Sequence, residues 1–302
     1  MLLLIPNPAL AWGPVAHLDI GTQLLSGAVA LAPSLLRLIE SRRLDFLYGS
    51  LAADAIVGKN RSCWHEHCHN WDVARSLLAA AEKEGESRRA FMLGYLGHLG
   101  ADVVAHNHIV PQMLILHYRA KGIGHLYWEA RVDNRLLEEH PKLEETWLEL
   151  GRARFPGHDR FLSVHLAPAL ISNRMSSQLF RRSIDVQSRR PWKIALRRID
   201  RGSRLMLPRE TLLRWSRLAL EGARRAVTNP HSRRLDRLDP TGRQALEFAL
   251  AKRRALRRMM RRGVGQDEVD EAYREALDGT QVVDINHFED DPASEPPRPQ
   301  VE

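Results

Sequence analysis

Apolar residues recur at every third or fourth position along most of this chain, the period of an amphipathic α-helix, and strict alternation is scarce. The pattern predicts an all-α protein with no sheet. We expect the helix 34–51 to end near Asp54, Asp72 to cap the next helix, and the helix 87–106 to stop before Pro111. The predicted helices are one that begins at Pro14 and those over 34–51, 72–85, 87–106, 123–139, 141–152, 210–227 and 243–262.

The chain has no internal repeat and no long Gly/Ser linker, which favours one helical core over residues 12–228. Residues 229–280 read as a basic helical extension. The tail 281–302 should be flexible, because its residues 284–302 hold six acidic residues and four prolines and few apolar ones.

Residues 1–11 form an apolar leader that ends in a small-x-small sequence just before Trp12. Either the leader is cleaved, or the true start lies elsewhere, or the segment is a buried N-terminal arm. Cleavage would indicate an exported protein, periplasmic or secreted, and an intact leader a cytoplasmic one. No run of about 18 apolar residues could cross a bilayer.

Charge divides the 302-residue sequence into unlike halves. Residues 1–150 contain 14 Lys+Arg and 17 Asp+Glu, a net of −3, whereas residues 151–302 contain 31 and 20, a net of +11, which together give the formal +8. Ten of the 14 histidines lie in the acidic half. Histidines among carboxylates suggest a metal, and arginines suggest an anionic partner.

Two His-x3-acid pairs carry the strongest chemical signal. His98 and Asp102 are four apart on one predicted helix, as are His125 and Glu129 on the next, so each pair shares a helix face. Two such pairs on adjacent helices can project into one interior pocket, where nitrogen and carboxylate ligands suit zinc. The two cysteines in CWHEHC leave three readings open: a disulfide, a metal cluster with the flanking histidines, or two free thiols.

The order of candidate ligands resembles that of the zinc-dependent phospholipase C family and the related single-strand-specific zinc nucleases. The resemblance covers residues 12–129 and implies an all-α helical bundle with up to three zinc ions in one cleft. It rests on Trp12-x4-His17, Asp54, His69-x2-Asp72, His98-x3-Asp102-x5-His108 and His125-x3-Glu129.

The resemblance also implies how the ligands divide among the ions. One zinc would take Asp54, His69, His98 and Asp102. A second would take the α-amino and carbonyl groups of Trp12, together with His17 and a bridging Asp102, which requires removal of residues 1–11. The third would take His108, His125 and Glu129.

The activity so implied is phosphodiester hydrolysis by a zinc-activated water, with a phospholipid as the expected substrate and Asp54 as the residue that orients or deprotonates the water. The short separation in sequence between His108 and the pair His125-x3-Glu129 resembles the phospholipases more than the nucleases. The family's choline-binding pattern is not matched, because Ala55 and Glu66 stand where aromatic residues would. A non-catalytic zinc-binding membrane adaptor is the third reading.

The basic half and the other histidines are less specific. Residues 151–282 contain 30 Lys+Arg and 14 Asp+Glu, a net of +16, which could meet an anionic membrane, follow a nucleic acid, or simply be solvated. His106 could replace His108 as a ligand, although the spacing from Asp102 favours His108. We expect His65 and His67 to lie at the mouth of the cleft or on the surface. The remaining histidines have no acidic partner at ligand spacing and are not expected to bind metal (His117, His140, His158, His165, His231, His287).

Overall fold

The computed structural model describes residues 13–54, 68–120, 125–166 and 209–281, except for the side chains of residues 125–127. Within these ranges every regular element is a helix, which confirms the all-α prediction. None of the helices described is both long and apolar enough to span a membrane.

The first helices are α1 (Pro14–Leu25), α2 (Pro33–Ser41) and α3 (Arg43–Ala52). The single helix expected over 34–51 is therefore wrong. At Arg42 the backbone leaves the helical region, with φ −121° and ψ 39°, and the chain bends. The expected end near Asp54 is confirmed, because α3 stops at Ala52.

The next helix, α4 (Trp71–Glu82), begins before the position expected for it. Its cap is Asn70, whose side chain accepts hydrogen bonds from the backbone N–H groups of Asp72 and Val73 at 2.8 and 3.4 Å. The prediction that Asp72 is the cap is wrong. Asp72 already lies in the first turn, where its carboxylate complements the helix dipole.

The helical segment that starts with the central helix α5 (Glu86–Val104) does not end before Pro111. It continues through a π-helical turn, η3 (Ala105–Ile109), into α6 (Val110–Leu116). Pro111 falls in the first turn of α6, where the missing backbone N–H costs little. The expected stop is therefore wrong, and His106 and His108 both lie on the helical π turn rather than in a loop.

Four other predicted helices are present with nearly the expected bounds, and α9 and α14 are helices that the pattern did not single out. The remaining elements are α7 (His125–Glu139), α8 (Pro141–Arg152), α9 (Pro156–His165), α12 (Arg209–Thr228), η4 (Leu235–Arg237), α13 (Arg243–Arg261), α14 (Gln266–Asp278) and η5 (Gly279–Gln281).

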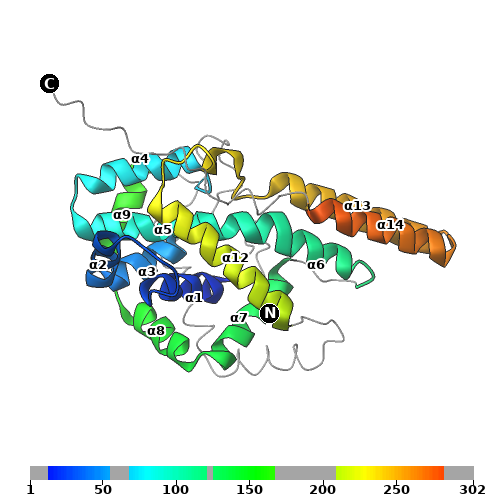
Figure 1. Ribbon diagram of the computed structural model, residues 1–302, viewed down its shortest axis with the longest axis horizontal. Coiled ribbons are helices and arrows are strands. Elements are labelled where there is room, and N and C mark those ends of the chain that lie inside the picture. Colours follow the sequence, from blue (N-terminus) through cyan, green and yellow to red (C-terminus); the bar gives the residue numbers. More distant parts are fainter. Residues whose placement is uncertain (1–12, 55–67, 121–124, 167–208, 282–302) are drawn as a thin grey trace.

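Helix α5 lies in the core and packs along α3 and α12 (Figure 1). The helices meet through glycines. A Cβ at Gly94 of α5 would stand 2.0 Å from the Phe46 carbonyl oxygen of α3, and one at Gly100 would stand 2.4 Å from the carbonyl oxygen of Gly222 on α12. Backbones this close hold α5 firmly against both partners, and α5 is the helix that carries His98.

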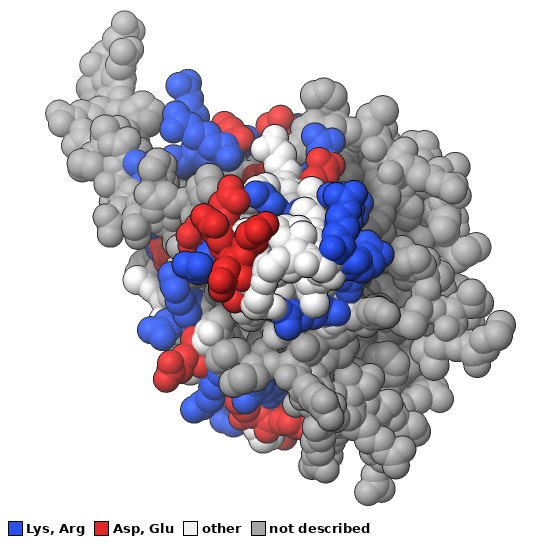
Figure 2. Space-filling view, turned by 90° about the vertical axis from the view of Figure 1, so that its right-hand side faces the viewer, with Lys and Arg blue, Asp and Glu red and all other residues white. Residues whose placement is uncertain are grey.

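Helices α13 and α14 form a pair that extends away from the rest of the molecule (Figure 1). Seen from that end, basic and acidic side chains gather on different sides (Figure 2), with exposed arginines such as Arg258 on α13 and exposed acids such as Glu268 on α14. Not all of the basic residues face solvent. Arg253 and Arg257 donate to the backbone carbonyls at the end of α6, those of Tyr118 and Ala120. The division between a core and a basic extension stays a prediction.

Candidate metal centre

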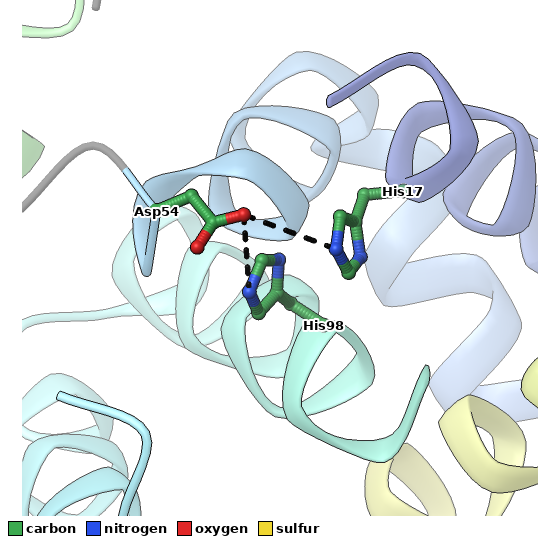
Figure 3. A group of neighbouring side chains, drawn as sticks. All are labelled: His17, Asp54 and His98. Atoms are coloured by element: carbon green, nitrogen blue, oxygen red, sulfur yellow. Dashed lines mark ion pairs between the residues drawn. The ribbon is translucent and has the colours of Figure 1, made fainter. Parts of the chain in front are cut away.

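Five of the predicted ligands come together at one buried point. His17 comes from α1, Asp54 from the turn after α3, His69 from the turn before α4, and His98 and Asp102 from α5. Figure 3 shows three of them, His17, Asp54 and His98, pointing toward one another from their separate elements. All but Asp54 are 1–2% exposed.

The ligand atoms lie at regular distances. The Nε2 atoms of His69 and His98 are 3.2 Å apart, and they lie 3.1 and 3.2 Å from Oδ2 of Asp102. Asp54 oxygens lie 3.3 Å from the His69 nitrogen and 3.8 Å from the His98 nitrogen. His17 reaches the other oxygen of Asp102 at 3.3 Å and Asp54 at 4.0 Å.

These distances fit a zinc ion. Four atoms arranged tetrahedrally at zinc–nitrogen and zinc–oxygen bond lengths of about 2.0–2.1 Å lie about 3.3 Å from one another. The three edges among His69, His98 and Asp102, at 3.1–3.2 Å, approach that spacing, and Asp54 adds one oxygen 3.3 Å from the His69 nitrogen. In addition, neither carboxylate oxygen of Asp102 meets hydrogen-bond geometry with a described residue, despite four nearby imidazoles. The carboxylate of Asp102 is thus buried among imidazole nitrogens without a hydrogen bond to them, as expected for a residue that binds a cation.

The electrostatics of the cluster suit a cation. Burial alone would raise the pKa of Asp102, but the charges of His98, His106 and His17 outweigh burial and hold this pKa well below its usual range. For His17, burial first and then the charge of His98 lower the pKa. These two directions favour the forms that bind zinc, an ionised carboxylate for Asp102 and a neutral imidazole for His17.

Two contacts orient the imidazoles from behind. Nδ1 of His98 lies 2.9 Å from the backbone carbonyl of Ser50, which can only accept, so Nδ1 carries the proton and the Nε2 lone pair faces the cluster. Nδ1 of His69 lies 3.2 Å from Sγ of Cys68, and the hydroxyl of Tyr95 donates to the Cys68 carbonyl. Sequence analysis missed Ser50, since a backbone carbonyl carries no ligand motif, and it singled out Cys68 without foreseeing the contact of its thiol with His69.

Of the two histidines on the π turn, His106 lies nearer to Asp102. Its Nε2 is 3.7 Å from Oδ2 of Asp102, and its side chain is 1% exposed. The helix continues past Val104, so His106, four residues after Asp102, shares its face. His108 is buried as well, and burial together with the charge of Arg214 lowers its pKa to about 4. Sequence analysis favoured His108 by its spacing from Asp102, although the i, i+4 spacing of His106 from Asp102 could have pointed to the nearer residue.

The remaining predicted ligands are only partly described. Glu129 is buried on α7, whereas the His125 side chain lies outside the described residues, so the site of His108, His125 and Glu129 stays a prediction. Trp12 also lies outside them, as do Cys63, His65 and His67. Cys68 is a free, buried cysteine, so the structure contradicts a disulfide at this residue, whereas the extra metal cluster around CWHEHC stays untested.

Outside the cluster, His158 on α9 is buried in a different polar network. Its Nε2 lies 2.8 Å from Asp45 of α3, Arg88 of α5 contacts Nδ1, and the ring stacks on Phe91 at 4.3 Å. Burial lowers its pKa. The sequence shows no acidic partner for His158 at ligand spacing, because Asp45 reaches it only through the fold.

Comparison with known proteins agrees with this geometry. A family model described as zinc dependent phospholipase C matches residues 16–167, which is 152 of the 302 residues and includes His17, Asp54, His69, His98 and Asp102. No curated protein and no solved structure matches the chain. With half of its length matched by this model and an all-helical fold around a His/Asp cluster, the chain belongs to the zinc dependent phospholipase C family.

Proposed function

We propose that this protein is a zinc-dependent phosphodiester hydrolase that cleaves a phospholipid in the manner of a phospholipase C. The observation that carries the proposal is the cluster of His69, His98 and Asp102, whose ligand atoms lie 3.1–3.2 Å from one another with Asp54 beside them, in a chain of this family. The match to the family supports the reaction class, and the substrate is our inference.

The chain's own residues would hold the metal in two overlapping sets. His69, His98 and Asp102 form one group, and His17, Asp54 and His98 form a second. Asp54 also lies 3.3 Å from His69, and Asp102 lies 3.3 Å from His17. When bound, zinc supplies polarisation of the phosphoryl oxygens and a lower pKa for nearby water. The Ser50 carbonyl keeps the His98 nitrogen lone pair directed at that position.

Asp54 is the residue we assign to the attacking water. Asp54 has the most exposed side chain of the five clustered residues, 8% exposed against 1% for Asp102. It also follows the end of α3 rather than lying inside a helix. A carboxylate at the solvent edge can orient a water molecule and accept its proton, whereas Asp102 is enclosed by imidazoles.

For the third ion we keep the predicted ligands His108, His125 and Glu129, which would stabilise the leaving oxygen. With Trp12 included, the protein would hold up to three zinc ions. The second site depends on a free α-amino group at Trp12, because only a deprotonated amine ligates. Removal of residues 1–11 and export of the protein are part of the proposal, and intact mass together with zinc counting tests them.

The second partner that we propose is an anionic membrane surface met by the exposed side of α13. Its exposed arginines include Arg254, Arg258 and Arg261, and Met260 on the same helix is exposed as well. Basic residues with an apolar neighbour favour contact with anionic headgroups. The acidic residues of α14 lie on a different side and would face away (Figure 2).

The test is a substrate comparison with the zinc-loaded protein. A chromogenic phosphocholine ester, mixed phospholipid vesicles and single-stranded DNA are each incubated with and without a chelator. We expect chelator-sensitive release of diacylglycerol from the vesicles. Release of nucleotides instead would favour the zinc nuclease, and silence on all three substrates with zinc bound would favour the adaptor.

Two variants make the comparison specific. His98→Ala removes a proposed ligand and should abolish hydrolysis together with at least one zinc. His158→Ala removes the same kind of side chain from a separate buried network, and should keep both hydrolysis and the full zinc content. Full zinc content in the His98 variant would contradict the ligand assignment.

A further inference from the structure

Helix α1 begins without a capping side chain of its own. Its N-cap residue is Gly13, and Pro14 follows in the first turn. The cap comes from another helix: the carboxylate of Asp133 on α7 accepts hydrogen bonds from the backbone N–H groups of Val15, at 3.3 Å, and Ala16, at 3.0 Å. A carboxylate placed there accepts from two buried N–H groups of the first turn and complements the positive end of the helix dipole.

The fit between Asp133 and Gly13 is unusually close. A Cβ added to Gly13 would lie 2.1 Å from Oδ2 of Asp133 and 2.5 Å from Oδ1. The backbone of Gly13 has φ −67° and ψ 163°, a conformation open to any residue. Glycine is therefore needed at position 13 because the carboxylate approaches there, and not because of the backbone conformation.

This contact joins two elements that carry proposed ligands. The second bonded amide belongs to Ala16, the residue before His17, and the residue before Gly13 is Trp12. On α7, Asp133 lies one helical turn after Glu129, and both side chains are buried. The cap thus fixes the start of α1 against the helix that supplies the third proposed site.

We infer that Asp133 is a positioning residue of the metal centre, which anchors the first turn of α1 to α7 and thereby places His17 for metal binding. The inference rests on the proposed function insofar as that function requires zinc at His17. The role of Asp133 does not depend on hydrolysis: a carboxylate that touches no metal sets the zinc affinity of the His17 site through the backbone of α1.

The experiment measures zinc affinity and stoichiometry in zinc-buffered solution, with circular dichroism to confirm folding. In Asp133→Ala both acceptors are lost, and we expect zinc affinity at the His17 site to fall about 10- to 100-fold, as for other groups that orient metal ligands. Asp133→Asn keeps an oxygen acceptor and should retain affinity near that of the wild type, since asparagine caps helices as well as aspartate.

Gly13→Ala gives an independent test of the same contact. Its methyl group would displace the carboxylate, so zinc affinity should fall. When Gly13→Ala is combined with Asp133→Ala, zinc affinity should fall little further than in Asp133→Ala alone, because the carboxylate that the methyl group would displace is absent. Val269→Ala is the control: Val269 is buried in α14, far along the chain, so its loss should lower stability and leave zinc binding unchanged.

A folded Asp133→Ala protein with wild-type zinc affinity would overturn the inference. If that variant does not fold, Gly13→Ala decides: a folded protein with full affinity overturns the inference, and reduced affinity supports it. A wild-type protein that binds zinc but hydrolyses no phospholipid would refute the proposed function alone and leave this test intact. A wild-type protein that binds no zinc would refute both.

Discussion

The contact between α5 and α3 at Gly94 allows a quantitative test of how the fold supports the metal centre. The perturbation is Gly94→Ala, one methyl group on a buried helix. The new Cβ would lie 2.0 Å from the carbonyl oxygen of Phe46 and 2.8 Å from the backbone nitrogen of Ser50, both on α3. Carbon atoms in normal contact are about 3.5–4.0 Å from a neighbour, so the helices must separate by more than about 1 Å.

The magnitude follows from two opposing terms. Alanine in place of glycine favours a helix by about 0.5–1 kcal/mol. Overpacking of a tight core costs about 1–3 kcal/mol, and the upper end applies here because both obstructing atoms belong to the backbone and have no rotamer to change. We expect a net loss of about 2 kcal/mol, which for a chain of this size corresponds to a fall in Tm of about 4 °C.

Gly97→Ala is the matched control on the same helix. A Cβ there would meet a methyl group of Val227 at 3.3 Å and a methyl group of Leu24 at 3.8 Å, so side chains need to give only by a few tenths of an ångström. The helix-forming gain should offset that contact and leave stability near that of the wild type. The two variants make the same chemical change three residues apart and differ only in what the methyl group meets.

The assay combines thermal unfolding with zinc titration. Separation of α3 from α5 would also lengthen the hydrogen bond from His98 to the Ser50 carbonyl, so Gly94→Ala should lose about tenfold or more in zinc affinity while Gly97→Ala keeps it. Equal stability and equal zinc affinity in the two variants would refute the argument that backbone contact with α3 orients His98.

Three further predictions follow from single features of the site. Burial raises the pKa of Asp133 to about 7, above the 3.8 of an exposed carboxyl. Because the folded state then holds this proton more tightly than the unfolded state, Asp133 contributes its full share to the unfolding free energy of the metal-free protein below about pH 4. That contribution is lost as the pH rises to about 7. The unfolding free energy of the wild type relative to Asp133→Asn should therefore fall by about 2–3 kcal/mol between pH 5 and 8, and a constant difference would contradict the pKa. Chelation of zinc should lower the Tm, since zinc at about 100 times its Kd stabilises the folded state by about 2.7 kcal/mol; re-added zinc should restore it, and an unchanged Tm would argue against a metal. His158→Ala should lower stability by about 1–3 kcal/mol through the lost contacts to Asp45 and Arg88, and a parallel loss of zinc would show that its network is coupled to the centre.

The sequence by itself determined the fold class, and it named five residues that the structure brings together, His17, Asp54, His69, His98 and Asp102. The 3.6-residue period decides which residues share a helix face, and it placed His98 beside Asp102 without any knowledge of the packing. Local signals were less exact at boundaries. The bend at Arg42 and the cap at Asn70 depend on a single backbone conformation and a single side-chain contact, which the apolar pattern does not encode.

Only the tertiary structure decided which of these faces meet, and how closely. His17, Asp54 and His69 join Asp102 from three other elements, and the capping bond from Ala16 to Asp133 spans 117 residues. Such contacts depend on distances between helices, which glycines at their crossings set to within about an ångström. Periodicity fixes the direction of a side chain on its own helix, whereas the position of that helix against the next results from packing of the whole core.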